Sequence, residues 1–250
     1  MSHTSKIAVV ILAAGQGKRM NSPLPKVMHL LKDKPIIGHI VSAFEKVESV
    51  GKIIVVVPSN HTLIQDYLGN RVEYCIQTEQ KGTGHAVQCT EDMVRENFEN
   101  VIVIYGDLPC ISTESLDRLV EKHVHEKNQI TMMTTPVQDY NEWRAPFLTY
   151  GRIVRNTEGS IQEIVEYKDA NEQQKNILEV NSGVYCFRAD WLFEQLKYVN
   201  TNNAQSEFYL TDVVKMALER EETVNTVLLN PQEAIGVTTQ EDIKVLESLS

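Results

Sequence analysis

The chain reads Ile-Ala-Val-Val-Ile-Leu-Ala-Ala-Gly-Gln-Gly-Lys-Arg-Met at residues 7–20, and this stretch decides the fold. Its first six residues are continuously apolar and rich in β-branched side chains, which predicts a parallel strand buried on both faces. Small residues and two cations follow the strand directly. The end of this strand therefore indicates a nucleotide site.

The loop after this strand has the composition of a polyphosphate site. Gly15 and Gly17 permit positive φ and close backbone approach, so successive amide groups can point at an anion. Lys18, Arg19 and, beyond a turn with two prolines, Lys26 supply charge that can balance a triphosphate. By itself the loop also fits an ordinary strand-to-helix turn with solvated lysines, so other motifs have to decide.

Two familiar nucleotide motifs are excluded at this loop. A Walker A loop requires glycine where the chain has Leu12, and a dinucleotide fingerprint requires glycine where it has Met20. The loop is therefore neither a Walker A loop nor a dinucleotide fingerprint.

Composition predicts one domain over residues 1–250, since 42% hydrophobic side chains suffice for a sizeable core. The formal net charge of -10 excludes broad electrostatic binding to nucleic acid or acidic membranes. No apolar run approaches the ~20 residues of a membrane helix, and the polar first six residues are not a secretory signal. The four cysteines are scattered without a Cys-x-x-Cys pair, so we expect reduced thiols in a cytoplasmic protein.

Apolar strand patterns and amphipathic helix patterns alternate along the chain, which predicts a Rossmann-like, mostly parallel sheet flanked by helices. Near the middle, two short strand-like runs in residues 150–165 flank Asn-Thr-Glu-Gly at 156–159, which predicts a β-hairpin that interrupts the alternation as a small lobe. The predicted strands are residues 7–12, 53–57, 72–76, 101–105, 130–134, 180–187 and 224–229, and the predicted helices include residues 36–47, 112–123 and 239–249.

The strand at residues 101–105 ends in Tyr105, Gly106 and Asp107. A carboxylate at the carboxyl end of a central parallel strand lies where open α/β sheets bind ligands. Magnesium takes one or two carboxylates and leaves its other positions to water and phosphate, so Asp107 is a candidate ligand. The alternative is an aspartate that caps the turn before Pro109.

A second polar loop follows the strand at residues 72–76. The amide of Gln77 can read a base edge, with Gly82 and Thr83 approaching through the backbone. The alternative is a helix cap in a glycine-rich turn, and we expect His85 to pack at the start of that helix.

Further along, Glu166, Asn181 and residues 202–212 provide hydroxyl-binding groups suited to a sugar ring. Singly, each of them also fits a solvated charge or a turn residue.

Together these motifs resemble the sugar-nucleotide pyrophosphorylases, and more narrowly the uridyltransferase domain of the bacterial bifunctional N-acetylglucosamine-1-phosphate uridyltransferases. Matching blocks in matching order cover most of the chain. They are Leu-Ala-Ala-Gly-x-Gly-x-Arg-Met at 12–20, Leu-Pro-Lys-Val at 24–27, Gln-x-Glu-Gln-x-Gly-Thr-Gly-His-Ala at 77–86, Tyr-Gly-Asp-x-Pro at 105–109, Tyr-Gly-Arg-Ile at 150–153, Glu-x-Lys-Asp-Ala at 166–170, Asn-x-Gly at 181–183 and Asn-Asn-Ala-Gln-x-Glu-x-Tyr-x-Thr-Asp at 202–212.

The resemblance implies a nucleotide-diphospho-sugar transferase fold, UTP and N-acetylglucosamine 1-phosphate as substrates, and Mg²⁺ as cofactor. It implies that Arg19 and Lys26 act on phosphates and that Asp107 holds the metal. It assigns nucleotide binding to Leu12, Ala13, Ala14, Gly15, Gln77, Gly82, Thr83, Tyr105, Gly106 and Asp107, and sugar binding to Gly151, Glu166, Asn181, Tyr209 and Thr211.

Three departures from the family pattern bear on function. Thr238 stands where the family has an asparagine that provides a second metal ligand, and residues 138–148 do not match the shorter family segment. The chain carries no hexapeptide-repeat β-helix, so we expect no acetyl transfer, no CoA partner and a monomer. A pyrophosphorylase for another sugar 1-phosphate, or a sugar-nucleotide-binding regulator, remains the alternative.

Overall fold

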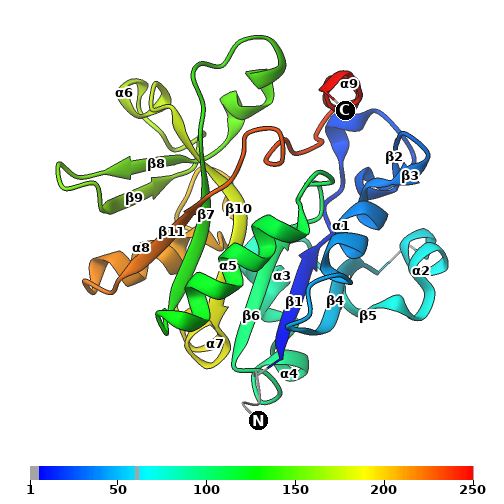
Figure 1. Cartoon of the computed structure of the whole chain (residues 1–250), viewed down its shortest axis with the longest axis horizontal. Coiled ribbons are helices and arrows are strands. Elements are labelled where there is room, and N and C mark those ends of the chain that lie inside the picture. Colours follow the sequence, from blue (N-terminus) through cyan, green and yellow to red (C-terminus); the bar gives the residue numbers. More distant parts are fainter. Residues whose placement is uncertain (1–5, 60–61, 250) are drawn as a thin grey trace.

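The computed structural model describes residues 6–59 and 62–249. A nine-stranded sheet crosses the molecule in the order β11-β7-β10-β6-β1-β4-β5, and β8 and β9 extend it from β10 (Figure 1). The strands are β1 (Ile7–Leu12), β4 (Val50–Pro58), β5 (Glu73–Gln77), β6 (Asn100–Tyr105), β7 (Ile130–Pro136), β8 (Arg152–Arg155), β9 (Ile161–Val165), β10 (Glu179–Arg188) and β11 (Val224–Leu228), with a separate ribbon of β2 (Leu30–Leu31) and β3 (Lys34–Pro35).

The strand directions confirm a mostly parallel sheet, with one exception on the path from β11 to β5 and an antiparallel β8–β9 hairpin beside it. β1 runs parallel to β4 and β6, β4 to β5, and β7 to β11, whereas β10 is antiparallel to both β6 and β7. The exception arises because β10 follows the β8–β9 hairpin, which returns the chain along the sheet in the opposite direction. Leu12 lies level with Val56 and with Tyr105, so the loops after β1 and β6 leave from one edge of the sheet.

The apolar β1 sequence is explained by two cores, one on each face of the sheet. Ile7, Val9 and Ile11 pack in the core shared with α1 and α5, and Ala8 and Val10 pack in the core shared with α3, α7 and α8. Figure 1 shows α5 crossing in front of the sheet. The helices are α1 (Ile36–Phe44), α2 (Leu63–Leu68), α3 (Thr83–Gln88), α4 (Glu91–Val94), α5 (Thr113–His125), α6 (Glu172–Lys175), α7 (Ala189–Leu196), α8 (Thr211–Glu219) and α9 (Gln240–Leu249).

The predicted hairpin forms β8 and β9, and its turn closes through the amide of Asn156, which donates to the carbonyl of Ser160 at 3.0 Å. β8 joins the main sheet where Arg152 pairs with Val180 of β10, and α8 packs on β9. The unmatched stretch before the hairpin forms a 3₁₀ helix, η4 (Glu142–Thr149). These elements place the small lobe beside the edge of the sheet where β6 ends.

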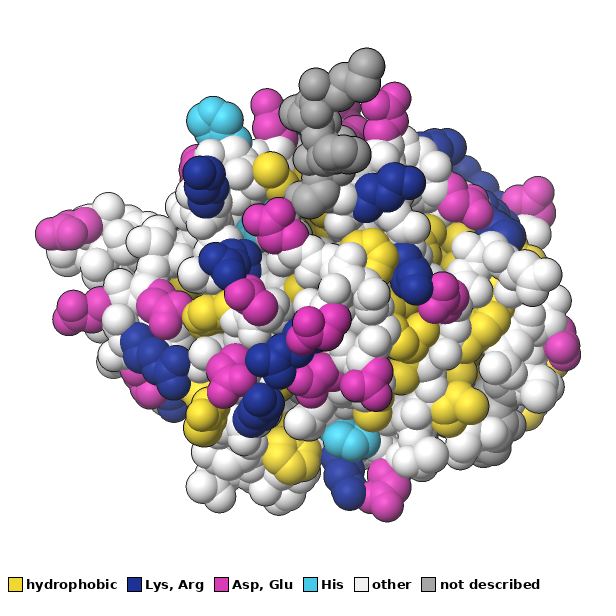
Figure 2. Space-filling view, turned by 90° about the horizontal axis from the view of Figure 1, so that it is seen from below, with side chains coloured by type: hydrophobic (Ala, Val, Ile, Leu, Met, Phe, Trp, Pro, Cys, Tyr) yellow, Lys and Arg dark blue, Asp and Glu magenta, His cyan; other side chains and the backbone are white. Residues whose placement is uncertain are grey.

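Among residues 6–59 and 62–249, the helices are too short or too polar to span a bilayer. Figure 2 views the end of the molecule at which β1 begins. Acidic and basic side chains of the described residues are interspersed over this face. The cations that converge on one cavity lie at the opposite edge of the sheet, where β1 ends.

Candidate active site

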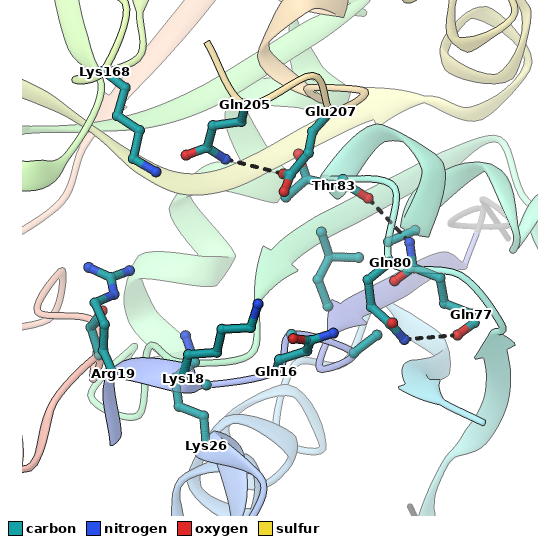
Figure 3. A pocket seen from close by; sticks show the side chains of 17 residues that line it. Gln16, Lys18, Arg19, Lys26, Gln77, Gln80, Thr83, Lys168, Gln205 and Glu207 are labelled. Atoms are coloured by element: carbon teal, nitrogen blue, oxygen red, sulfur yellow. Dashed lines mark hydrogen bonds between the residues drawn. The ribbon is translucent and has the colours of Figure 1, made fainter. Parts of the chain in front are cut away.

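A cavity of about 500 Å³ opens at the carboxyl end of β1 and β5. Figure 3 shows its three walls: the loop after β1, the segment after β5, and a facing wall with Lys168, Gln205 and Glu207. The lining residues are Leu12, Ala14, Gly15, Gln16, Gly17, Lys18, Arg19, Lys26, Gln77, Gln80, Gly82, Thr83, Ala86, Lys168, Gln205, Glu207 and Thr238.

Two short 3₁₀ helices, η1 (Lys18–Met20) and η2 (Lys26–Met28), carry three cations of this cavity. They approach closely because Gly17, which precedes η1, packs against Lys26 of η2. Gly17 has φ +58°, and a Cβ there would lie 2.9 Å from the Cβ of Lys26. A glycine at this position therefore lets Lys26 reach the cavity.

The backbone conformation of Gly15 differs from the prediction of a positive φ. Its φ is not positive, and among the described residues no atom outside Gly15 and its two chain neighbours lies within 4 Å of the position that a Cβ would take. The left-handed residue of this loop is Gly17. Gly15 instead presents bare backbone to the open cavity, where a ligand can approach it closely.

The wall after β5 is held by backbone hydrogen bonds to the segment before α8. The amide of Phe208 donates to the carbonyl of Lys81 at 2.8 Å, and the amide of Gly84 donates to the carbonyl of Phe208 at 2.8 Å. Gly82 has φ +114°, and a Cβ there would lie 2.5 Å from the carbonyl oxygen of Phe208. This packing fixes the backbone of residues 81–84 against the cavity.

Two further cavities adjoin the first. One of about 200 Å³ is lined by Asp107, Gly151 and Glu166 among others, and one of about 410 Å³ extends past Glu166 to Tyr209. Arg19 lines all three cavities, and its guanidinium therefore stands at their junction. The second cavity is lined by Arg19, Tyr105, Asp107, Leu108, Thr149, Tyr150, Gly151, Glu166, Asn181, Ser182 and Thr238, and the third by Arg19, Thr149, Glu166, Tyr167, Lys168, Gln205 and Tyr209.

Asp107 lines the second cavity and contacts Lys26, which lines the first. Its carboxylate forms an ion pair with the ammonium of Lys26, and its backbone carbonyl accepts from the amide of Val237 at 2.8 Å. The described residues contain no cluster of three or more His, Cys, Asp and Glu side chains that could enclose a metal ion. Asp107 fits the other mode, in which Mg²⁺ takes one carboxylate and completes its shell with phosphate and water.

The polar floor of the second cavity is Glu166 and Asn181. Burial raises the pKa of the Glu166 carboxyl, and the hydroxyl of Thr211, which donates to Glu166 Oε1 at 3.0 Å, partly offsets that rise. The amide nitrogen of Asn181 donates to the hydroxyl of Tyr185 at 2.5 Å, and its oxygen accepts from the amide of Gly183 at 3.1 Å. These bonds hold both side chains in place before any ligand arrives.

The comparison with protein families agrees with this geometry. The family model described as nucleotidyl transferase matches residues 8–232. The chain belongs to this family.

Bifunctional GlmU proteins are among the relatives of this nucleotidyl transferase. That of Streptococcus agalactiae is 40% identical over 241 residues, covering 96% of this chain and 51% of that protein. That of Clostridium perfringens is 37% identical over 241 residues, with the same 96% and 51% coverage. That of Desulfotalea psychrophila is 34% identical over 248 residues, covering 99% of this chain and 71% of that protein. The chain thus spans about half the length of the first two relatives.

Solved structures of nucleotidyl transferases share the fold. A putative glucose-1-phosphate thymidylyltransferase from Bacillus anthracis, in complex with a sucrose, superposes with a TM-score of 0.77 at 20% identity, covering 97% of this chain and 94% of that one. A UDP-glucose pyrophosphorylase complexed with UDP-glucose gives a TM-score of 0.74 at 19% identity, with 98% of each chain covered. Both likenesses support the nucleotide-diphospho-sugar transferase fold that the sequence predicts.

Most of the residues singled out from the sequence of this nucleotidyl transferase line one of the three cavities. Three do not. Ala13 is buried in the core, Gly106 bridges two strand ends by donating to the carbonyl of Leu12 at 2.9 Å, and Thr211 reaches the site through Glu166.

Several residues that line the cavities were not assigned a role from their sequence pattern. Their positions within the matched motifs, or directly beside them, were the available signal. They are Gln16, Gln80, Thr149, Tyr150, Tyr167, Lys168 and Ser182.

The role of Arg152 was also not predicted from the sequence. It is fully buried in the small lobe, and its guanidinium donates to the carbonyls of Lys175 at 3.2 Å, of Leu148 at 2.9 Å, of Phe147 at 3.4 Å and of Tyr150. The rings of Tyr140 and Tyr167 lie 4.6 and 5.2 Å from the guanidinium carbon. Arg152 therefore ties the η4 segment to the wall of the second cavity.

Proposed function

We propose that this chain joins UTP and N-acetylglucosamine 1-phosphate to give UDP-N-acetylglucosamine and pyrophosphate. The observation that carries the proposal is the position of Arg19 between two unlike cavities. One cavity has the amide of Gln77 and the cations of the β1 loop, and the other has Glu166 and Asn181. Two anionic substrates can meet at such a junction.

The reaction needs no nucleophile from the protein. An oxygen of the sugar phosphate attacks the α-phosphorus of UTP, the new phosphorus–oxygen bond forms, and the bond to the leaving pyrophosphate breaks. The work of the protein is to place the two phosphates in line and to neutralise their charge. Arg19 and Lys26 are the residues that we assign to this task.

In this proposal the nucleotide and the sugar bind to different walls of the cavities. Leu12, Ala14 and Gly15 line the nucleotide with backbone, and Gln77, Gly82 and Thr83 hold uracil. Glu166 and Asn181 form hydrogen bonds with sugar hydroxyls. Tyr209 borders the N-acetyl group in the adjoining cavity. A divalent ion, which we propose to be Mg²⁺ held by Asp107, supplies charge neutralisation for the triphosphate when bound.

Release of pyrophosphate tests the proposal. The purified chain is incubated with Mg²⁺, each of four nucleoside triphosphates and a panel of sugar 1-phosphates. We expect release with UTP and N-acetylglucosamine 1-phosphate above all other pairs. Release with glucose or galactose 1-phosphate alone would reassign the sugar, and binding of UDP-sugar without release would indicate a regulator.

A further inference from the structure

The amide of Gln77 is held in one orientation by two partners behind the cavity wall. Its nitrogen donates to the carbonyl of Gly82 at 3.3 Å and to Nδ1 of His85 at 2.9 Å. A backbone carbonyl can only accept, so the end of the amide that faces Gly82 is the NH₂ group. Both of its N–H bonds are thereby used within the protein.

The His85 ring completes this arrangement from the other side. Since Nδ1 accepts from Gln77, the ring proton of neutral His85 resides on Nε2, which lies 4.0 Å from the Sγ of Cys89. Burial lowers the pKa of His85 and nearby Lys81 lowers it further, whereas the Glu79 carboxylate and a hydrogen bond to the Glu79 backbone raise it. The pKa is lowered on balance, which favours the neutral ring. The ring of Phe208 lies 6.4 Å from that of His85, centroid to centroid, and adds no charge.

The remaining polar atom of the Gln77 side chain is Oε1. Gln77 is 3% exposed and lines the large cavity, and within the described residues no donor is recorded for Oε1. The amide therefore offers this cavity an acceptor and no donor. Uracil carries a hydrogen at N3, which an acceptor can bind, whereas cytosine carries a lone pair there, which an acceptor repels.

We propose that His85 is a positioning residue that fixes the Gln77 amide with its oxygen toward the base and thereby sets the preference for uracil over cytosine. The proposal rests on the proposed function, because it takes the cavity beside Gln77 as the base site. Without the Nδ1 acceptor, Gly82 alone retains the NH₂ group. The amide can then rotate and present donors to a cytosine N3.

The experiment compares kcat/KM for UTP and CTP in the wild type, His85→Leu and His85→Asn, measured with the sugar 1-phosphate that the wild type uses. Leucine removes the acceptor, and we expect the UTP/CTP ratio to fall by at least about tenfold, the scale on which a lost hydrogen bond changes discrimination. Asparagine returns an oxygen near the Nδ1 position. We expect it to keep the ratio within about threefold of the wild type.

Melting temperatures of all variants report on folding, and His125→Leu on the exposed end of α5 is the matched control. If His85→Leu unfolds, the UTP/CTP ratio of His85→Asn carries the test, and a fall beyond the threefold limit given above would overturn the proposal. A folded His85→Leu enzyme with the wild-type ratio would overturn the proposal. A wild type that releases no pyrophosphate from UTP would instead overturn the proposed function, so the two failures are distinguishable.

Discussion

Lys26 and Asp107, which are 81 positions apart in the sequence, form an ion pair at the junction of the cavities. The side chains are 20% and 17% exposed, so water screens the pair only partly. Both groups have a second task in the proposed reaction, since phosphate competes for Lys26 and a divalent ion competes for Asp107. The pair thus holds the two charges in place until substrates separate them.

Substitution of either cation at this junction tests the phosphate role. We expect Lys26→Ala and Arg19→Ala each to reduce turnover by at least about a hundredfold, the scale of one preorganised charge contact. Steady-state pyrophosphate release measures the effect. Lys197→Ala removes a surface lysine paired with Glu194 and is the matched control. Near-normal turnover in both junction variants would reject these roles.

Thr238 lines both the large cavity and the second cavity, and Asp107 also lines the second. A hydroxyl is a poorer metal ligand than an amide carbonyl, so we expect Thr238→Asn to lower the Mg²⁺ concentration at half-maximal activity. A magnesium titration of both proteins measures this concentration. Identical half-saturation in the two titrations would show that position 238 does not contribute to the metal site.

Gly82→Ala tests the wall that we assign to the base. The new Cβ would meet the backbone of Phe208, and the positive φ adds strain of about 1–3 kcal/mol. We expect a lower melting temperature and a raised KM for UTP. Gly159→Ala is the control, because Gly159 also has a positive φ, +84°, but has open space around it. If the two variants behave alike in KM, the clash with Phe208 does not shape the base site.

His123 gives a prediction for acid stability. It is 1% exposed, its Nε2–H donates to Asn100 Oδ1 at 3.1 Å, and its Nδ1 accepts from the Thr131 hydroxyl at 3.0 Å. Burial lowers its pKa to about 4. The unfolded chain takes up the proton near pH 6.5, so the free energy of unfolding falls as pH drops from about 6.5 to about 4, by at most about 3 kcal/mol.

Urea denaturation at pH 7.5 and pH 4.5 measures this loss. His123→Gln keeps a donor for Asn100 but does not titrate. We expect the variant to lose less stability than the wild type between the two pH values. An equal loss in both proteins would assign the acid sensitivity to other groups.

Local patterns sufficed to predict most of the elements. β1 was predicted to the residue, because its apolar run is bounded by a charged residue and a glycine loop. α5 was predicted from its apolar stripe after a cap at Ser112 or Thr113, and the structure places the cap at Ser112. The direction of β10 could not be predicted in this way, since its apolar sequence suits a parallel or an antiparallel strand equally well. The strands with which β10 pairs decide its direction.

The same distinction, between local patterns and pairing partners, separates the site residues that could be predicted from those that could not. Residues within contiguous motifs, such as Arg19, Lys26 and Gln77, were predicted to share a nucleotide site, and the structure brings them to one cavity. Arg152 was left without a role because its hydrogen-bond partners are backbone carbonyls. A carbonyl leaves no mark in an amino-acid sequence.

The surroundings of Arg152 have one more consequence. Within residues 6–59 and 62–249, the atoms that receive its hydrogen bonds are peptide oxygens, none of which gains or loses a proton in water. An arginine bound to a carboxylate would loosen on acidification, whereas this anchorage is indifferent to acidity. This anchorage of the η4 segment should therefore outlast the protonation of Glu166, leaving acid to change the chemistry of the pocket before it releases that wall.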